Sequence, residues 1–321
     1  MKILIIKSEG QPVRLLKDEH LAKIKQLDEG IEVAATFDEE EIAKHVIDAD
    51  VVACSPRNFP SIEGAKNLKW VHSFSAGMDR ILTPEMKNSD IILSNSSGIH
   101  ATPIAEHIIG FMLIFTRGFF NTFRNQQKKV WQKNEELTEL RDKVVLILGL
   151  GRIGTEAARL ASCFGANVFA IDTSQKEKPD FVEDLKGPDS LSGMLGQADF
   201  VALCLPYTKE NHHFFDGEKM KQMKSSAVLI NIGRGGVVHE QELIDALRNK
   251  VIAGAGLDVT EEEPLSEDSP LWGMENVVLT PHHSGLSEKY MDRAIDRFCL
   301  NIQAFLKGER LPNLVDKELG Y

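Results

Sequence analysis

Short apolar runs alternate with amphipathic segments along the first hundred residues of the chain. Five of these runs are expected to be strands: residues 2–6 (KILII), 31–35 (IEVAA), 51–55 (VVACS), 68–74 (LKWVHSF) and 91–95 (IILSN). Helical patterns at about residues 12–27 and 39–47 separate the first three. Because this alternation is typical of βαβ units, the segment is predicted to form a small, doubly wound parallel sheet.

The pattern then changes to one long apolar helix, expected from about residue 102 to 120, with Thr102 as N-cap and Pro103 at the first helical position. A polar stretch, residues 121–142, follows it. Six further strands are expected at residues 143–149, 167–172, 200–206, 227–233, 251–258 and 276–282. A last helix, at about residues 287–306, leads to a tail that is expected to return to the first domain. The predicted fold class is therefore α/β, with two doubly wound parallel-sheet domains.

Length and charge narrow the class of protein. A chain of 321 residues is too long for a single core of ordinary size, which agrees with two domains. The 37 Lys and Arg residues against 48 Asp and Glu residues leave a net charge of −11, which would repel a phosphate backbone, so no nucleic acid partner is expected. The cysteines are scattered singly, as in a reduced, cytoplasmic protein (Cys54, Cys163, Cys204 and Cys299).

No segment of the sequence predicts a signal peptide or a membrane partner. The first seven residues, MKILIIK, contain only four consecutive apolar positions. The longest apolar run, residues 108–115, is too short to span a bilayer.

A glycine-rich turn follows the first strand of the second series. Residues 143–148 lead into Gly149, Gly151 and Gly154 of the segment GLGRIG, and then into a helical pattern. This order binds the pyrophosphate of a dinucleotide: Gly149 permits the turn, Gly151 lets backbone amides approach the phosphates, and Gly154 allows the helix to pack against the strand. Arg152 and Ile153 are expected to contact the cofactor as well.

Asp172 ends the next strand, 18 residues beyond Gly154. A carboxylate at about this distance meets the ribose hydroxyls of NAD, and its charge repels the 2′-phosphate of NADP. No cation follows in Thr173, Ser174 and Gln175, so the predicted cofactor is NAD (NADH). The alternative is a glycine turn without a ligand, beside a surface aspartate.

Polar residues end three later strands: residues 231–235 (NIGRG), Asp258, and residues 280–282 (TPH). Ligands of open parallel sheets bind at the carboxyl ends of the strands, so one cleft is expected to collect these residues. Arg234 offers a planar fork of donors for a substrate carboxylate. A histidine can exchange a proton near neutral pH, which makes His282 the candidate acid and base, and Glu263 could fix its tautomer and stabilise the imidazolium.

Each of these residues also fits a role without chemistry. An arginine between glycines is often a surface turn, a lone histidine is often structural, and glutamates in a row, as at residues 261–263, are often a solvated loop. Three further histidines, His212, His213 and His283, lack the spacing of a zinc site, so no metal is expected. No GxSxG or P-loop motif predicts a serine nucleophile or a nucleoside triphosphate site.

Four motifs together carry a family resemblance: GLGRIG with Asp172, NIGRGG, LDVTEEEPL and TPHHSG, in this order. Over essentially its whole length the chain resembles the D-isomer-specific 2-hydroxyacid dehydrogenases. Its loop VHSFSAGMDRIL (residues 71–82) looks more like the loops of glyoxylate or hydroxypyruvate reductases than like those of lactate dehydrogenases. The resemblance implies that Arg234 binds the carboxylate and carbonyl of a small 2-hydroxy or 2-keto acid. It also implies that His282 is the acid and base, tuned by Glu263.

The resemblance assigns further residues to the cofactor and to the substrate. Asp258 would contact the nicotinamide amide, and Ile232 and Gly233 are expected beside the cofactor. Backbone amides of the first domain would bind the substrate carboxylate, at Ser75, Ala76 and Gly77. The formate-oxidising branch of the family typically carries a glutamine at the position of Glu263, which argues against that branch.

The resemblance also implies a Rossmann cofactor domain, residues 100–284, inserted into a flavodoxin-like substrate domain, residues 1–99 and 285–321. A homodimer is expected through the cofactor domain, with Trp131 at or near the contact. The identity of the substrate stays open, and the candidates for contact with its side chain are Phe74, Arg80, His100 and the last helix. Related chains serve as NAD-sensing corepressors, in which the dinucleotide controls docking of a partner, and this alternative also stays open.

Overall fold

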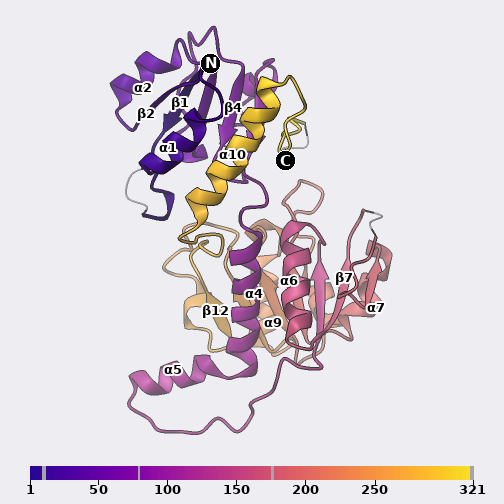
Figure 1. Cartoon of the computed structure of the whole chain (residues 1–321). Coiled ribbons are helices and arrows are strands. Elements are labelled where there is room, and N and C mark those ends of the chain that lie inside the picture. Colours follow the sequence, from indigo (N-terminus) through magenta and orange to yellow (C-terminus); the bar gives the residue numbers. More distant parts are fainter. Residues whose placement is uncertain (9–11, 79, 175–176, 319–321) are drawn as a thin grey trace. The chain divides into compact units, whose positions relative to one another are not determined.

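In the computed structural model, residues 1–8, 12–78, 80–174 and 177–318 are described (Figure 1). Asp79 and Gln175, which belong to two of the segments singled out in the sequence, lie outside the described residues. The chain divides into two compact units: unit 1 comprises Met1–His100 with Leu286–Tyr321, and unit 2 comprises Ala101–Gly285.

Unit 1 is built on a five-stranded sheet in which every pairing is parallel. Its strands are β1 (Lys2–Ile6), β2 (Glu32–Thr36), β3 (Val51–Cys54), β4 (Trp70–Ser73) and β5 (Ile92–Asn95). Their order across the sheet is β2-β1-β3-β4-β5, which is that of flavodoxin-like folds. The order changes direction between β1 and β3, and folds of this class bind ligands at the carboxyl ends of such strands.

Two pairs of helices cover the faces of this sheet. α1 (Asp18–Lys25) and α10 (Tyr290–Leu306) pack on one face, over a core that includes Trp70 and Phe298. α2 (Glu39–Val46) and α3 (Pro84–Lys87) pack on the other face, over a core that includes Leu4 and Met86. Because successive side chains of a strand point to opposite faces, the apolar run of β1 contributes to both cores.

The single helix expected at residues 12–27 was a wrong prediction. Pro12–Arg14 forms a short 3-10 turn, η1, and α1 begins only at Asp18. Lys17 is extended, and Asp18 and Glu19 place negative charge in the first turn of α1, where it stabilises a helix. The break leaves Arg14 outside α1.

Unit 2 is built on a seven-stranded sheet, again with parallel pairing throughout. The strands are β6 (Val144–Leu148), β7 (Asn167–Ile171), β8 (Asp184–Lys186), β9 (Phe200–Leu203), β10 (Val228–Asn231), β11 (Gly254–Leu257) and β12 (Val277–Leu279). Their order is β12-β11-β10-β9-β6-β7-β8. This is the doubly wound dinucleotide-binding order with one strand added beyond β11, and the order changes direction between β6 and β9. The predicted α/β fold class, with two parallel sheets, is confirmed.

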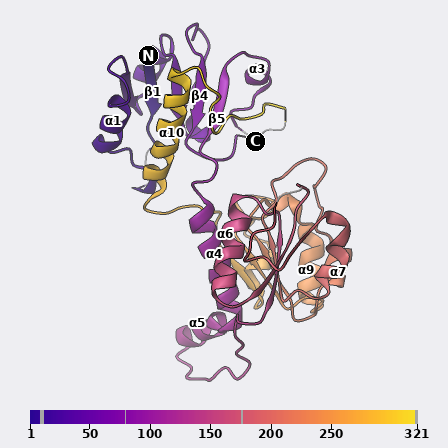
Figure 2. The same cartoon turned by 45° about the vertical axis from the view of Figure 1, so that its right-hand side comes forward.

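Helices also cover both faces of the second sheet (Figure 2). α4 (Ala101–Thr116) and α6 (Arg152–Cys163) pack together on one face, and α7 (Leu191–Leu195), α8 (Gly217–Gln222) and α9 (Glu240–Arg248) cover the other. Short 3-10 turns complete the described elements: η2 (Pro56–Asn58) in unit 1, and η3 (Pro188–Ser190), η4 (Gly235–Val237) and η5 (Pro270–Gly273) in unit 2.

Three local features of unit 2 differ from the sequence expectation. α4 begins at Ala101, so Thr102 lies in its first turn and is not its N-cap. Gly118, with a φ of 59°, separates α4 from α5 (Phe119–Gln127), which extends into the expected polar stretch. β8 was not expected because this edge strand is three residues long and polar at two of them, so it leaves no apolar run in the sequence.

Among the described residues, no single helix is long and apolar enough to cross a membrane. α4 and α5 meet that requirement only as a pair bent by 70°, and seven side chains of α4 are buried within the protein. The four cysteines are free thiols.

Candidate active site

The glycine turn joins β6 to α6, and its three glycines differ in what surrounds them. Gly149 has a φ of 92°, a conformation that favours glycine. A Cβ on Gly154 would lie 2.0 Å from the carbonyl oxygen of Gly149, so only glycine lets α6 pack this close to the turn. A Cβ on Gly151, in contrast, would meet none of the described atoms within 4 Å. The chain therefore leaves open space at Gly151, as the approach of a phosphate requires.

This open space lies at the amino terminus of α6, a helix of 12 residues that begins with Arg152 and Ile153. The first amides of a helix have no partner within the helix and carry a partial positive charge. Backbone donors beside an open glycine suit the pyrophosphate of a dinucleotide. The turn thus fits the cofactor that the sequence predicts.

The carboxylate of Asp172 is fixed against the same turn. Directly after β7, its Oδ2 accepts a hydrogen bond of 2.7 Å from the amide of Leu150, and its Oδ1 accepts one of 2.7 Å from the amide of Ser174. The hydroxyl of Ser174 also donates to Oδ1. Two backbone amides therefore orient this carboxylate at the strand end where the ribose of the cofactor was expected.

Arg234 lies in a braced turn after β10. The buried side chain of Asn231 accepts a hydrogen bond from the Gly233 amide and donates one to the Arg234 carbonyl, both of 3.1 Å. A Cβ on Gly235 would lie 1.8 Å from the carbonyl oxygen of Thr260, so the turn packs directly on the segment after β11. The guanidinium is exposed and donates to the Gly233 carbonyl at 2.9 Å. A fixed backbone beneath an exposed guanidinium suits recognition of a carboxylate.

His282 and Glu263 form a hydrogen-bonded pair. The Nδ1 atom of His282 lies 2.7 Å from Oε2 of Glu263, and both side chains are partly exposed. Because a carboxylate accepts, Nδ1 carries the proton, and Nε2 is the ring nitrogen left for chemistry. Oε1 of Glu263 accepts from the amide of Thr260 at 3.4 Å, and through Thr260 the pair is connected to the Arg234 turn.

Asp258 anchors the segment that carries His282. It follows β11 with only 1% of its surface exposed, and its carboxylate accepts from the Thr280 hydroxyl at 2.6 Å and from the amides of His283 and Ser284 at 3.1 Å. Several donors are what a buried carboxylate needs. In the structure Asp258 positions residues 280–284, and its contact with nicotinamide stays a prediction.

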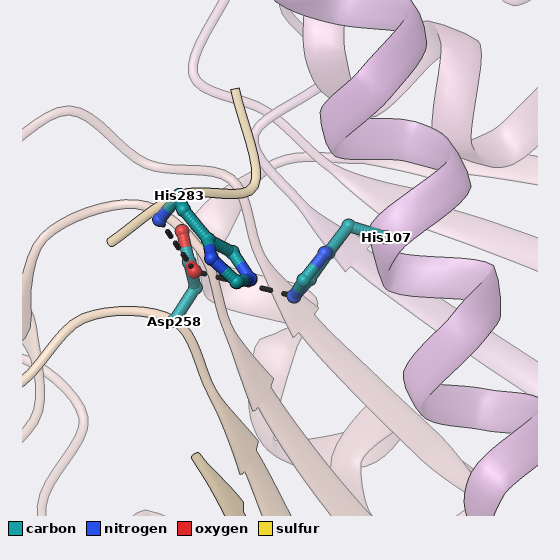
Figure 3. Close-up of side chains that lie close together, drawn as sticks. All are labelled: His107, Asp258 and His283. Atoms are coloured by element: carbon teal, nitrogen blue, oxygen red, sulfur yellow. Dashed lines mark hydrogen bonds and ion pairs between the residues drawn. The ribbon is translucent and has the colours of Figure 1, made fainter. Parts of the chain in front are cut away.

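A histidine of α4, His107, points toward this anchor (Figure 3). Its Nε2 lies 3.0 Å from Oγ1 of Thr280 and 4.0 Å from Oδ1 of Asp258. Because the Thr280 hydroxyl donates to Asp258, it accepts from His107, so a chain of hydrogen bonds runs from imidazole through hydroxyl to carboxylate. Burial lowers the pKa of His107 and outweighs the opposing charge of Asp258, while His283 lowers it further. The sequence did not single out His107; its one signal was an imidazole within an apolar helix.

The other expected substrate residues lie in unit 1. Ser75, Ala76 and Gly77 follow β4 at the carboxyl end of its sheet. The amide of Ser75 donates to Oγ of Ser73 at 3.1 Å, whereas in the described part of the chain the amides of Ala76 and Gly77 donate to no acceptor.

The last helix, which was also expected to contact the substrate's side chain, is α10, and the three single residues expected there differ in their surroundings. Phe74 is buried and Arg80 is exposed. The ring of His100 lies 5.2 Å from that of Tyr290.

The structure thus gathers four of the expected residues at the carboxyl ends of the adjacent strands β10, β11 and β12: Arg234, Asp258, Glu263 and His282. Ile232, two residues before Arg234, is buried. The chemical roles of these residues stay predictions.

Three groups of described residues place potential metal ligands within 4.8 Å of one another: His107, Asp258 and His283; His212, His213 and Glu261; and Glu19, His20 and Asp292. In each group a carboxylate already accepts a hydrogen bond, such as the 2.6 Å bond from Nε2 of His213 to Glu261. The rings of His212 and His213 stack with their centroids 3.7 Å apart, so their in-plane lone pairs run side by side. Interactions within the chain therefore account for these groups.

Comparisons with known proteins identify the family of the chain. Residues 109–284 match the family model described as D-isomer specific 2-hydroxyacid dehydrogenase, NAD binding domain. A glyoxylate reductase of Thermofilum pendens is 33% identical over 288 residues, which cover 87% of this chain and 85% of that protein. A solved structure of a D-isomer specific 2-hydroxyacid dehydrogenase family protein from Aeromonas salmonicida has a TM-score of 0.87 at 29% identity. The match covers 98% of this chain and 99% of that protein's chain.

A second solved structure is that of an NADPH-dependent glyoxylate/hydroxypyruvate reductase from Sinorhizobium meliloti in complex with NADP and sulfate. Its TM-score is 0.82 at 27% identity, and it covers 100% of both chains. The family model spans more than half of the chain, and the relatives span nearly all of it. Unit 2 therefore holds an NAD-binding domain, and the chain belongs to the D-isomer-specific 2-hydroxyacid dehydrogenases, a family of NAD(P)-dependent oxidoreductases.

Proposed function

We propose that this enzyme reduces a small 2-keto acid to the D-2-hydroxy acid with NADH, and that it catalyses the reverse oxidation with NAD. The observation that carries the proposal is the hydrogen-bonded pair of His282 and Glu263, at the carboxyl end of the sheet that also carries the glycine turn. Glyoxylate and hydroxypyruvate, which appear in the names of two similar proteins, are the first candidate substrates.

Arg234 is proposed to bind the substrate. Its exposed guanidinium can hold a carboxylate in two parallel hydrogen bonds, and the braced turn beneath it fixes where the side chain begins. Backbone amides of unit 1 are proposed to add donors for the same carboxylate, at Ser75, Ala76 and Gly77. Of these, the amides of Ala76 and Gly77 carry no other hydrogen bond in the described part of the chain.

When bound, a nicotinamide cofactor would supply the hydride to C2 of the keto acid, or accept it in the reverse direction. His282 in its doubly protonated form donates the Nε2 proton to the carbonyl oxygen, which becomes the hydroxyl of the product. Glu263 stabilises the imidazolium before this transfer and keeps the Nδ1 proton in place after it. In the oxidation, Nε2 of the neutral ring takes the proton of the substrate hydroxyl.

The glycine turn with Arg152 and Ile153 is proposed to hold the pyrophosphate, and Ile232, Gly233 and Asp258 to lie on the nicotinamide side. The cofactor is proposed to be NAD in preference to NADP, because the Asp172 carboxylate would repel a 2′-phosphate. The reductase from Sinorhizobium meliloti is named as NADPH-dependent, so the preference is tested directly against NADPH. Equal kcat/KM values with NADH and NADPH would contradict the preference.

A homodimer through unit 2 is part of the proposal, since the family resemblance implies one. The side chain of Trp131, expected near that contact, is fully exposed in the single chain. A second copy would remove this large apolar surface from water.

The proposal is tested by following NADH oxidation with glyoxylate, hydroxypyruvate, pyruvate and bulkier 2-keto acids. Wild-type enzyme should turn over at least one of them. His282→Ala should lower kcat by about 10²- to 10⁴-fold, the usual contribution of a general acid, and leave NADH affinity in a fluorescence titration within about twofold. His45→Ala, on α2 in unit 1, is the matched control. Tight NADH binding without turnover of any keto acid would favour the corepressor-like role instead.

A further inference from the structure

A small pocket opens in unit 1 at the carboxyl ends of β1 and β3, where the strand order of the sheet changes direction. Open parallel sheets bind ligands at this position. Six of the lining residues matter for what the pocket could hold: Lys7, Ser8, Arg14, Ser55, Phe74 and Tyr290.

Arg14 is the residue that points to a ligand. It lies in η1 and is half-buried, its NH1 donates to Oγ of Ser55 at 3.2 Å, and its guanidinium carbon lies 5.0 Å from the centre of the Tyr290 ring. Its Nε is buried, yet among the described residues it has no hydrogen-bond partner. A buried donor without an acceptor is rare and unfavourable in a folded protein. An acceptor from outside the chain would satisfy it.

The charge of the lining favours an anion. Lys7 adds a second cationic residue to Arg14, and no carboxylate is among the described residues that line the pocket. A guanidinium in a carboxylate-free, partly apolar pocket binds a carboxylate more strongly than one in open solvent does, because little water competes. The pocket has a volume of about 10 Å³, so it can take about one oxygen atom at the end of a ligand, and the rest of the ligand would lie outside it.

The pocket also adjoins the loop that is proposed to bind the substrate. The hydroxyl of Tyr290 donates to the carbonyl of Phe74 at 2.9 Å, and Phe74 directly precedes Ser75. Burial raises the pKa of Tyr290 and outweighs the opposing charge of Arg14, so this hydroxyl stays protonated and keeps its bond to the loop. A substrate whose C2 end is held at Ser75–Gly77 would therefore have its far end beside Arg14.

We propose that Arg14 forms an anion-binding subsite that selects 2-keto acids with a second carboxylate at the far end of a short chain. The inference rests on the proposed function, and it narrows the substrate class from small keto acids in general to short 2-keto dicarboxylic acids. Arg14 donates Nε–H to the distal carboxylate, and Lys7 adds positive potential beside it.

The test uses pairs of substrates that share chain length and differ in the distal charge. Oxaloacetate is compared with 2-oxobutanoate, and 2-oxoglutarate with 2-oxopentanoate, in full-length enzyme with saturating NADH. Wild-type enzyme should prefer the dicarboxylate of at least one pair in kcat/KM, and the preference should lie in KM. Arg14→Gln, which replaces the charged guanidinium with a shorter, neutral amide, should reduce this ratio by about tenfold or more, as expected for one charge-assisted hydrogen bond.

Two further variants keep the result interpretable. Arg310→Gln makes the same substitution at an exposed position of unit 1 after α10 and should leave the ratio unchanged. Arg14→Lys keeps the charge without Nε and should give a ratio between those of wild type and Arg14→Gln. This intermediate value would exclude a general loss of folding as the cause.

The outcomes separate the inference from the function on which it rests. Turnover of glyoxylate or of monocarboxylates alone, with no preference for either dicarboxylate, would overturn the subsite and leave the proposed function standing. An unchanged ratio in Arg14→Gln would also overturn it. Failure to turn over any 2-keto acid would overturn both.

Discussion

The imidazole of His282 is held from two sides. Its backbone has a φ of 50°, a region in which a residue other than glycine costs about 1–3 kcal/mol and persists only where its surroundings hold it. Here its amide donates to the Asp258 carbonyl at 2.8 Å, and its Nδ1 donates to Glu263 at 2.7 Å. Backbone and side chain are thus fixed independently, as a proton donor that must meet a small substrate requires.

Glu263→Gln tests the negative charge beside His282. The imidazolium of residue 282 loses that neighbour and keeps only a neutral acceptor, so proton donation to the keto acid should be slower than in wild type. We expect kcat/KM for reduction to decrease by about tenfold or more, as for the loss of one charge-assisted interaction. The measurement is steady-state kinetics of NADH oxidation at varied keto acid.

Glu262→Gln is the matched control for that measurement. This exposed neighbour contributes its backbone carbonyl, not its carboxylate, to the loop, through the hydrogen bond from the Thr260 hydroxyl. Its kcat/KM should equal that of wild type. Equal kcat/KM values for all three proteins would remove Glu263 from the mechanism.

Arg234→Lys tests whether the geometry of the fork matters as well as its charge. A lysine keeps the charge but cannot form two parallel hydrogen bonds to one carboxylate, so KM for the keto acid should rise by about tenfold or more, while the affinity for NADH changes little. Steady-state kinetics at varied keto acid, with a fluorescence titration of NADH, measure the two effects. Wild-type KM and kcat in this variant would contradict the assigned role.

The residues of the candidate site that directly follow strands could be predicted from the sequence, because adjacent parallel strands end at the same edge of a sheet. Arg234, Asp258 and His282 could be grouped for that reason alone. His107 could not, since its contact with Thr280, 173 positions away, depends on how α4 packs on the sheet. The same holds for Arg14 and Tyr290, which meet only because α10 returns to the first sheet.

At the scale of elements, the glycines of the turn between β6 and α6 meet two different requirements, helix packing and space for a ligand. Gly154 serves the packing of α6 on the turn, because a Cβ there would lie 2.0 Å from a carbonyl oxygen. Gly151 serves something outside the chain, because a Cβ there would meet no described atom. Alanine at position 154 should therefore reduce stability, whereas alanine at position 151 should reduce cofactor binding.

Gly154→Ala should destabilise unit 2 by about 1–3 kcal/mol, the usual range for overpacking. Gly151→Ala should change stability by less than about 1 kcal/mol, as for an exchange at a helix N-cap, but should weaken NADH binding by about tenfold or more. Urea unfolding without cofactor measures the first effect, and a fluorescence titration of NADH measures the second. If Gly151→Ala bound NADH as tightly as wild type, the pyrophosphate would not lie at this glycine.

The elements that the sequence predicted well are those with a strong apolar period. Eleven strands follow apolar runs because a parallel strand covered on both faces needs apolar side chains on both. β8 was not predicted because it lies at the edge of the sheet, where half-exposed Asp184 and Leu185 leave no apolar run in the sequence. The helix expected at residues 12–27 is interrupted because the backbone of Lys17 is extended. The spacing of apolar residues does not reveal such a change in backbone conformation.

At the scale of the whole molecule, each of the two sheets has an apolar core on each face. Most large apolar side chains belong to one of these four cores. One segment of unit 2 departs from this pattern, with five large apolar side chains exposed: Phe119, Phe123, Val130, Trp131 and Leu137. In Figures 1 and 2, α5 and the chain after it extend away from the sheet of unit 2. Clustered apolar exposure of this kind marks a contact with another protein.

A second copy of the chain is the partner that we expect on this segment. Light scattering after gel filtration should give twice the 35.8 kDa of one chain, and Trp131→Ala combined with Phe123→Ser should shift the enzyme toward the mass of one chain. Loss of two apolar anchors of an interface weakens it far more than loss of scattered surface residues does. Tryptophan emission should move to longer wavelength on dilution, as Trp131 becomes hydrated.

Trp272→Ala is the control for the dimer, because Trp272 is also exposed but lies in η5, outside this segment. It should leave the mass at that of two chains. A wild-type enzyme that stays a single chain at micromolar concentration would contradict the dimer. A double variant that keeps the mass of two chains would instead place the contact on another face of unit 2, and the exposed apolar side chains of residues 119–137 would then need a different partner.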